Sequence, residues 1–158
     1  MTPSQARNAI KRCLKSILDP KLQAAEIDTL WAYFNGCCAY CGGQMDRPSR
    51  QAYKDHLVPE AEGGTNRLSN IVLSCGACNA DEKRESNWEQ FLTTKCPNDP
   101  ATAEQRLSKI RNWVQMNGGP VSLTTEQQEG VDSAFDRINA VLGECVDELR
   151  QLAKDDKT

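Results

Sequence analysis

The chain has 158 residues, a length that suits one compact domain or a small functional core with helical extensions. Charged residues make up 26% of it and no apolar run is long enough to cross a bilayer, which argues against a membrane protein. The net charge of −3 argues against a general nucleic-acid coat protein. Residues 1–18 lack the apolar core of a signal peptide, so we expect a cytosolic protein.

Two amphipathic helices are predicted near the N-terminus. Apolar residues recur at helical spacing from residue 4 to residue 18, where Asp19-Pro20 ends the pattern. The outer face of this first helix is basic. A second helix is predicted from about residue 21 to residue 34, because Asn35-Gly36 then interrupts the apolar spacing.

The middle of the chain, from residue 36 to about residue 78, is rich in glycine and turn residues. Its apolar runs are short and fall at residues 53–58 and 71–73. These runs predict two short strands, joined by the loop EAEGGTNRLSN.

Three helices are predicted after this middle region. The stretch NADEKRESNWEQFLTT, residues 79–94, has no glycine or proline and places Trp88 and Phe91 on one side of a helix. A further helix covers residues 101–116 and ends before a Gly-Gly-Pro break. The last and most acidic helix covers residues 124–154.

The last helix carries an apolar seam with steps of four and three residues, formed by Val131, Phe135, Ile138, Leu142, Cys145, Leu149 and Leu152. This heptad spacing has two interpretations. The seam can pack against the N-terminal helix of the same chain, or helix 124–154 can join a homodimer or a partner protein. Both interpretations stay open at the level of sequence.

Eight cysteines in a cytosolic chain favour a metal site over a disulfide framework. Four of them form two CxxC pairs, Cys38 with Cys41 and Cys75 with Cys78, so that four thiolates can close a tetrahedral shell around a structural Zn²⁺. Coincidental buried cysteines and a redox dithiol are the alternatives. The single cysteines are expected to be small buried hydrophobes: Cys13, Cys37, Cys96 and Cys145.

The only histidine, His56, directly follows Asp55 between the two CxxC pairs. An aspartate offers a hard oxygen ligand, and a histidine offers a base that titrates near neutral pH. Together they are the minimum for metal-assisted hydrolysis. The plainer alternative is a surface or hydrogen-bonded core histidine with no chemical role.

The sequence DHLVPEAEGGTNRLSNIVLSCGACNADEK closely resembles the signature of the HNH endonucleases, and the resemblance extends from Cys38 to about Lys83. It departs from the usual pattern at two places. Asn79 stands where many members have a histidine, and Lys83 comes one position later than is common. The resemblance implies a ββα-metal fold and a DNA endonuclease that leaves 3′-hydroxyl and 5′-phosphate ends.

The resemblance also implies a role for each matching residue. Asp55 and Asn79 would bind a catalytic Mg²⁺ or Mn²⁺, His56 would deprotonate the attacking water, and Asn70 would hold the loop that carries His56. The zinc ligands would be Cys38, Cys41, Cys75 and Cys78. Lys83 and Arg84 are candidates for contacts with flanking phosphates, and their plainer interpretation is solvated charge on a helix.

We therefore predict an α+β fold in which a zinc-clamped ββα-metal core, residues 36–95, lies between an N-terminal helical segment, 1–35, and a C-terminal helical extension, 96–158. The predicted function is metal-dependent hydrolysis of DNA phosphodiester bonds, in a free enzyme or in a subunit of a restriction or phage-defence assembly. The alternative is a catalytically silent zinc module that binds nucleic acid or a partner protein.

Overall fold

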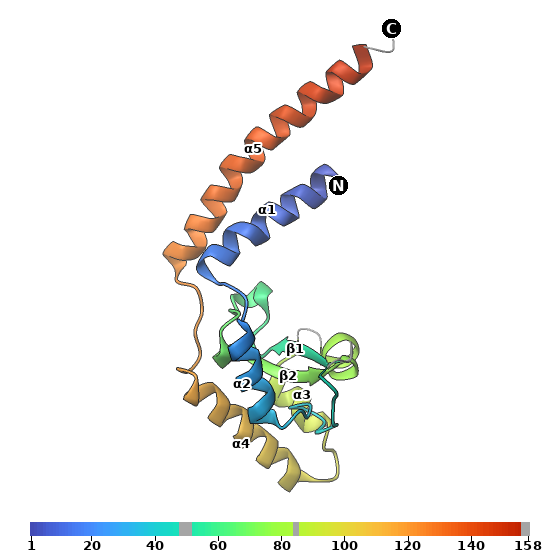
Figure 1. Cartoon of the computed structure of the whole chain (residues 1–158), viewed down its shortest axis with the longest axis vertical. Helices are drawn as coiled ribbons and strands as arrows, with labels where there is room; N and C mark the ends of the chain where they lie inside the picture. Colours follow the sequence, from blue (N-terminus) through green and yellow to red (C-terminus); the bar gives the residue numbers. More distant parts are fainter. Residues whose placement is uncertain (48–51, 84–85, 156–158) are drawn as a thin grey trace. The chain divides into compact units, whose positions relative to one another are not determined.

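The computed structural model describes residues 1–47, 52–83 and 86–155 (Figure 1). By its contacts the chain divides into two compact units. The central unit comprises residues 21–122, and the terminal unit joins residues 1–20 to residues 123–158. The division of the chain into residues 1–35, 36–95 and 96–158, which the sequence suggested, concerns functional segments and stays a prediction.

The terminal unit is a pair of helices, α1 (Pro3–Leu18) and α5 (Thr125–Asp155). Thr2 and Gln5 form a capping box at the start of α1. Lys11 pairs with Asp132 at 3.3 Å, and the Arg7 side chain donates to Asn139 at 2.7 Å, so the two helices run antiparallel (Figure 1). Part of the heptad seam on α5 is therefore covered by the N-terminal helix.

The pairing of α1 with α5 leaves much of their apolar surface uncovered. Val131 is the one hydrophobic residue of these helices that the described structure buries. Cys13 and Cys145 are exposed, and Cys37 and Cys96 are only partly covered. The expectation that the single cysteines are buried was therefore wrong. Cys13 and Cys145 are exposed because two paired helices cannot enclose all the residues along their contact.

None of the helices in the described ranges is both long and apolar enough to cross a membrane. Even α5, with 31 residues, carries charged side chains along its whole length.

The central unit contains α2 (Ala24–Phe34), β1 (Ala52–His56), β2 (Ile71–Cys75), α3 (Trp88–Thr94) and α4 (Pro100–Met116). A π-helical segment, η3 (Ala77–Lys83), follows β2 directly. The strands pair antiparallel, with Asp55 opposite Val72 and His56 opposite Ile71. The predicted α+β fold with two short strands is confirmed, and the order β1, β2, η3 is a ββα arrangement.

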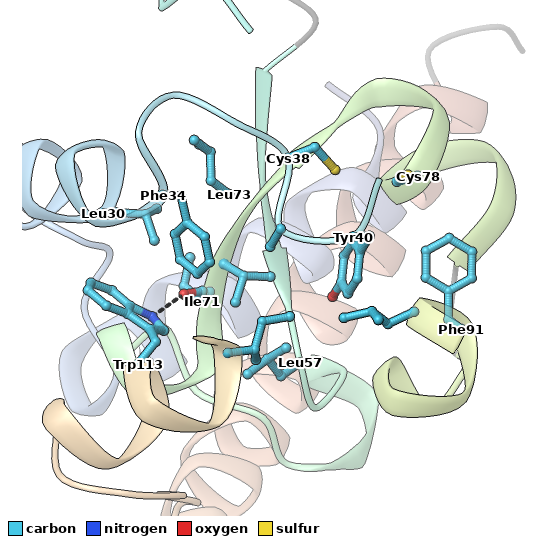
Figure 2. Packing of buried hydrophobic residues seen from close by; sticks show 14 of the residues in the cluster. Leu30, Phe34, Cys38, Tyr40, Leu57, Ile71, Leu73, Cys78, Phe91 and Trp113 are labelled. Atoms are coloured by element: carbon cyan, nitrogen blue, oxygen red, sulfur yellow. Dashed lines mark hydrogen bonds between the residues drawn. The ribbon is translucent and has the colours of Figure 1, made fainter. Parts of the chain in front are cut away.

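The core of the central unit lies between α2, β2 and α4, where Leu30, Phe34, Ile71, Leu73 and Trp113 pack together (Figure 2). The indole N–H of Trp113 lies 2.8 Å from the carbonyl oxygens of both Leu68 and Ile71. A buried indole N–H needs such an acceptor, and here the bond ties α4 to the start of β2. Helix α4 therefore fixes the position of β2.

The helix predicted over residues 79–94 is interrupted. Helical structure covers η3 and α3, and α3 begins at Trp88 after the N-cap residue Asn87. The Asn87 side chain accepts hydrogen bonds from the backbone N–H groups of Glu89 and Gln90, at 3.0 and 3.1 Å. An asparagine in this position is a strong N-cap, and such a cap starts a helix even where no glycine or proline marks a break.

Candidate metal centre and active site

Four cysteines converge where the loop after α2 meets the end of β2. The sulfur atoms of Cys38, Cys41, Cys75 and Cys78 all lie within 4.8 Å of one another, and those of Cys41 and Cys75 are 3.8 Å apart. Tetrahedral zinc with Zn–S bonds of about 2.3 Å needs sulfur atoms about 3.8 Å apart. The four residues predicted as ligands therefore fit a zinc ion, and Cys37 lies outside the cluster.

The environment of Cys38 favours a thiolate. Burial by itself raises the pKa of Cys38, but hydrogen bonds from the backbone N–H groups of Cys41, Cys75 and Tyr40 outweigh burial and lower it. Burial raises the pKa of Cys41, so the lowered pKa is a property of Cys38 and not of the loop as a whole.

Arg106 of α4 supports the same loop. Its guanidinium donates to the carbonyl oxygen of Tyr40 at 2.9 Å and to the sulfur of Cys96 at 3.1 Å. Gly42 has a positive φ of 74°, and a Cβ atom there would lie 2.5 Å from Arg106 Nη2. Glycine at position 42 therefore allows both the turn and the close approach of Arg106. Arg106 was not predicted from the sequence as a site residue.

His56 ends β1, and a quarter of its side-chain surface is exposed (25%). Its Nε2 lies 3.2 Å from Asn66 Oδ1 and 3.9 Å from Glu60 Oε1. With a proton on Nε2 the imidazole donates to Asn66, and Nδ1 then keeps its lone pair. Neither Asn66 nor Glu60 was predicted, because both approach His56 only through the fold of the intervening loop.

Asn70 anchors the loop that follows His56. It is 5% exposed and accepts a hydrogen bond from the Val58 N–H at 2.8 Å. Its amide N–H₂ group donates to the carbonyl oxygens of Val58 and Thr65, at 3.0 and 2.9 Å. At Gly64 a Cβ atom would lie 1.9 Å from the Val58 carbonyl oxygen, so only glycine allows the loop to close this tightly.

Replacement of Asn70 by alanine is expected to destabilise the central unit by about 3 kcal/mol, because partly buried backbone groups of Val58 and the buried carbonyl oxygen of Thr65 lose their partner. Asn112→Ala, at an exposed position of α4, is the matched control and should change stability by less than about 0.5 kcal/mol. Urea unfolding of both variants measures the difference. Equal stability of the two variants would contradict the anchoring role of Asn70.

Asp55 faces the interior, on the opposite side of β1 from His56, as alternation along a strand requires. The Tyr40 hydroxyl donates to Asp55 Oδ2 at 2.6 Å, and Lys83 Nζ lies 3.2 Å from the same oxygen. Burial, and then the charge of Asp55, raise the pKa of Tyr40 well above its usual value, so the phenol keeps its proton. Tyr40 is a further site residue that the sequence did not indicate.

Lys83 lies inside the protein, with only 1% of its side-chain surface exposed. Besides Asp55, its ammonium group contacts the carbonyl oxygen of His56 at 2.8 Å. These contacts differ from the flanking phosphate contact predicted from the sequence. Arg84, the other residue predicted to contact phosphate, falls outside the described residues.

Asn79 directly follows Cys78 of the cysteine cluster within η3 and is partly exposed. A metal ion bound by the cysteines would therefore restrict the backbone at Asn79. Interruptions of regular helix geometry of this π type are frequent at functional sites.

A family model described as HNH endonuclease matches residues 38–92. This segment, about a third of the chain, is similar to HNH endonuclease domains. The match begins at the first cysteine of the cluster and ends within α3, so it contains both strands, η3 and all four cysteines. The resemblance inferred from the Asp-His motif and the CxxC pairs is confirmed. No curated protein matches the chain.

The HNH domain match leaves α4 outside, although α4 supplies Arg106 and Trp113 to the same unit. The support that these two residues give to the cysteine loop and to β2 is therefore a feature of the structure beyond the matched segment.

Proposed function

We propose that this protein is a metal-dependent endonuclease that hydrolyses phosphodiester bonds of DNA at its HNH domain. The observation that carries the proposal is the position of His56. Its imidazole is partly exposed at the end of β1, it directly follows Asp55 in the strand, and it lies in the matched segment. A binding module has no need for a basic group held in this way.

His56 acts as the general base in the proposed reaction. Hydrogen bonding of Nε2 to Asn66 orients the ring, and Nδ1 takes the proton of the attacking water. Asn70 limits the motion of the loop that follows the base. The oxygen of the attacking water forms a bond to phosphorus, the bond between phosphorus and the 3′-oxygen breaks, and the leaving 3′-oxygen takes a proton from solvent water.

Asp55 and Asn79 are the residues that would hold Mg²⁺ or Mn²⁺. A carboxylate oxygen and an amide oxygen are the ligand types these ions prefer, and such a site leaves room for waters and a substrate phosphate. When bound, the ion supplies positive charge that stabilises the phosphate in the transition state. The chain's own residues supply the base and its orientation.

The four cysteines hold a structural Zn²⁺ in the proposed protein. Four sulfur ligands close the coordination shell and leave no position for water, which separates this site from the hydrolytic one. Free thiols at these positions require a reducing compartment, and we place the protein in a cytosol on this ground. Phosphate contacts by Arg84 remain part of the proposal, whereas Lys83 would have to leave its buried partners to make one.

Cleavage assays on purified, zinc-loaded protein test the proposed function. Supercoiled plasmid, linear duplex, single-stranded DNA and RNA are each incubated with Mg²⁺, with Mn²⁺ or with no added divalent ion. The control omits the ion and does not rely on EDTA, because EDTA would also remove zinc. Cleavage of DNA that depends on the added ion supports the proposal. Inactivity on all four substrates would favour the silent zinc module.

A second copy of the chain is the partner that the terminal unit fits best. A groove of about 700 Å³ lies between α1 and α5, lined mainly by Ile10, Leu14, Ile138, Val141, Leu142 and Cys145. Beyond the part of α5 that pairs with α1, Leu149 and Leu152 are 65% and 64% exposed. Helix α1 has basic but no acidic residues and α5 is acidic. In an antiparallel dimer each α1 therefore meets a helix of opposite charge.

The replacement of Leu149 and Leu152 by glutamate is expected to convert a dimer to a monomer, because charge cannot be buried in the apolar contact. Gln151→Glu lies between the two positions and is the control for added negative charge. Light scattering after gel filtration measures the mass of each variant. A monomeric wild-type protein would contradict the homodimer.

A further inference from the structure

We propose that Tyr40 and Lys83 are positioning residues that hold Asp55 and His56 in the geometry the reaction requires. This inference rests on the proposed function, because it concerns the same site. Its structural basis is a buried cluster in which Tyr40 and Lys83 meet on one oxygen of Asp55. The cluster joins the cysteine loop, β1 and η3.

Both contacts end on Oδ2 of Asp55, and Oδ1 makes no hydrogen bond or ion pair within the described residues. A carboxylate that is fixed through one oxygen presents the other in a constant direction. Outer partners of this kind orient metal-binding carboxylates and are nearly as important as the ligands themselves. Tyr40 and Lys83 therefore prepare Asp55 Oδ1 for a divalent ion.

Lys83 also connects the two elements on which the predicted active residues lie. It belongs to η3, which carries Asn79, and it contacts both Asp55 and the backbone of His56 on β1. A buried ammonium group needs partners of this kind to offset the loss of water. The lysine therefore sets the separation between the strand that carries the base and the helix that carries Asn79.

Tyr40 connects the zinc centre to the same point. It lies between Cys38 and Cys41 in the sequence, and its ring packs edge-on against Phe91 at 5.2 Å (Figure 2). Its hydroxyl group then reaches Asp55 from the cysteine side. An ion held by the cysteines thereby fixes Asp55 through Tyr40. Neither this ion nor Tyr40 needs to contact the substrate.

Two variants and two matched controls separate positioning from general structural support. Tyr40→Phe and Lys83→Met remove the contacts to Asp55. Tyr33→Phe removes a hydroxyl that donates to the Lys109 carbonyl oxygen at 2.9 Å, and Lys95→Met removes a lysine that pairs with Glu82. Tyr40→Phe removes only one hydroxyl group, so it keeps the test decisive if Lys83→Met fails to fold.

The first readout is Mn²⁺ binding to zinc-loaded protein, measured by calorimetry. Tyr40→Phe and Lys83→Met are expected to bind Mn²⁺ about 10- to 100-fold more weakly than wild type, the usual effect of losing an outer partner of a metal ligand. Tyr33→Phe and Lys95→Met should bind as wild type does. Wild-type Mn²⁺ affinity in both Tyr40→Phe and Lys83→Met would overturn the inference.

The second readout needs neither divalent ion nor DNA. His56 is the only histidine, so its imidazole C–H groups give a single set of NMR signals. These signals should move in Tyr40→Phe and Lys83→Met and stay in place in the two controls. Unchanged signals in both site variants would overturn the inference. A wild-type protein that neither binds Mn²⁺ nor cleaves DNA would contradict the proposed function, while the NMR signals would still decide whether Tyr40 and Lys83 position His56.

Discussion

Removal of zinc is expected to unfold the central unit of this protein. The four cysteines connect the loop after α2 to the end of β2 and the start of η3, and they enclose both strands of the matched segment. A sheet of only two strands is marginally stable without further support. Apparent zinc-binding free energies of about 10–16 kcal/mol in small zinc-bound peptides are comparable with the whole stability of a typical domain, about 5–15 kcal/mol.

Cys38→Ser and Cys37→Ser form a matched pair for this prediction. The two residues are neighbours, but only Cys38 has its sulfur in the cluster. Cys38→Ser is expected to lose zinc and the cooperative unfolding transition of the central unit, whereas Cys37→Ser should keep one zinc ion per chain. Metal analysis and near-ultraviolet circular dichroism, which reports on the packing of aromatic side chains such as Trp113, measure both effects. A folded, zinc-free Cys38→Ser protein would contradict the prediction.

Replacement of Lys83 by methionine is expected to lower the free energy of unfolding by about 3–5 kcal/mol, because it leaves the buried carboxylate of Asp55 without its cation. Methionine keeps most of the apolar stem and removes the charge. The matched control, Lys95→Met, breaks a more exposed ion pair with Glu82 and should cost about 0–1 kcal/mol.

Urea unfolding of the two lysine variants, with zinc saturated throughout, measures the difference. A loss below about 1 kcal/mol in Lys83→Met would show that the buried ion pair does not stabilise the fold. The double variant with Asp55→Asn should be less destabilised than the sum of the single variants, because removal of both charges also removes the unpaired carboxylate.

The sequence predicted those parts of the site that depend on local spacing. Two CxxC pairs specify four ligands, and the Asp-His motif before a Gly-Gly turn specifies where the candidate base lies. The structure places the four sulfur atoms together and locates His56 at the end of β1. Such features were readable because each is contained within a few consecutive residues.

The rest of the site depends on contacts between distant parts of the chain. Arg106 reaches the carbonyl oxygen of Tyr40, and Lys83 reaches Asp55, only after α4 and η3 have packed. No periodicity or motif distinguishes a lysine that becomes buried from one that stays in water. The break before α3 was not predicted, because the apolar spacing continues past Asn87 and does not mark this residue as an N-cap.

The most direct test of the proposed mechanism is DNA cleavage by His56→Gly, with and without added imidazole. The variant must first keep its zinc and its unfolding temperature. General-base catalysis contributes about 10²- to 10⁴-fold, so the cleavage rate should fall by that factor and recover in part when imidazole fills the space left by the side chain. A variant that cleaves at the wild-type rate would contradict the assignment of His56 as the base.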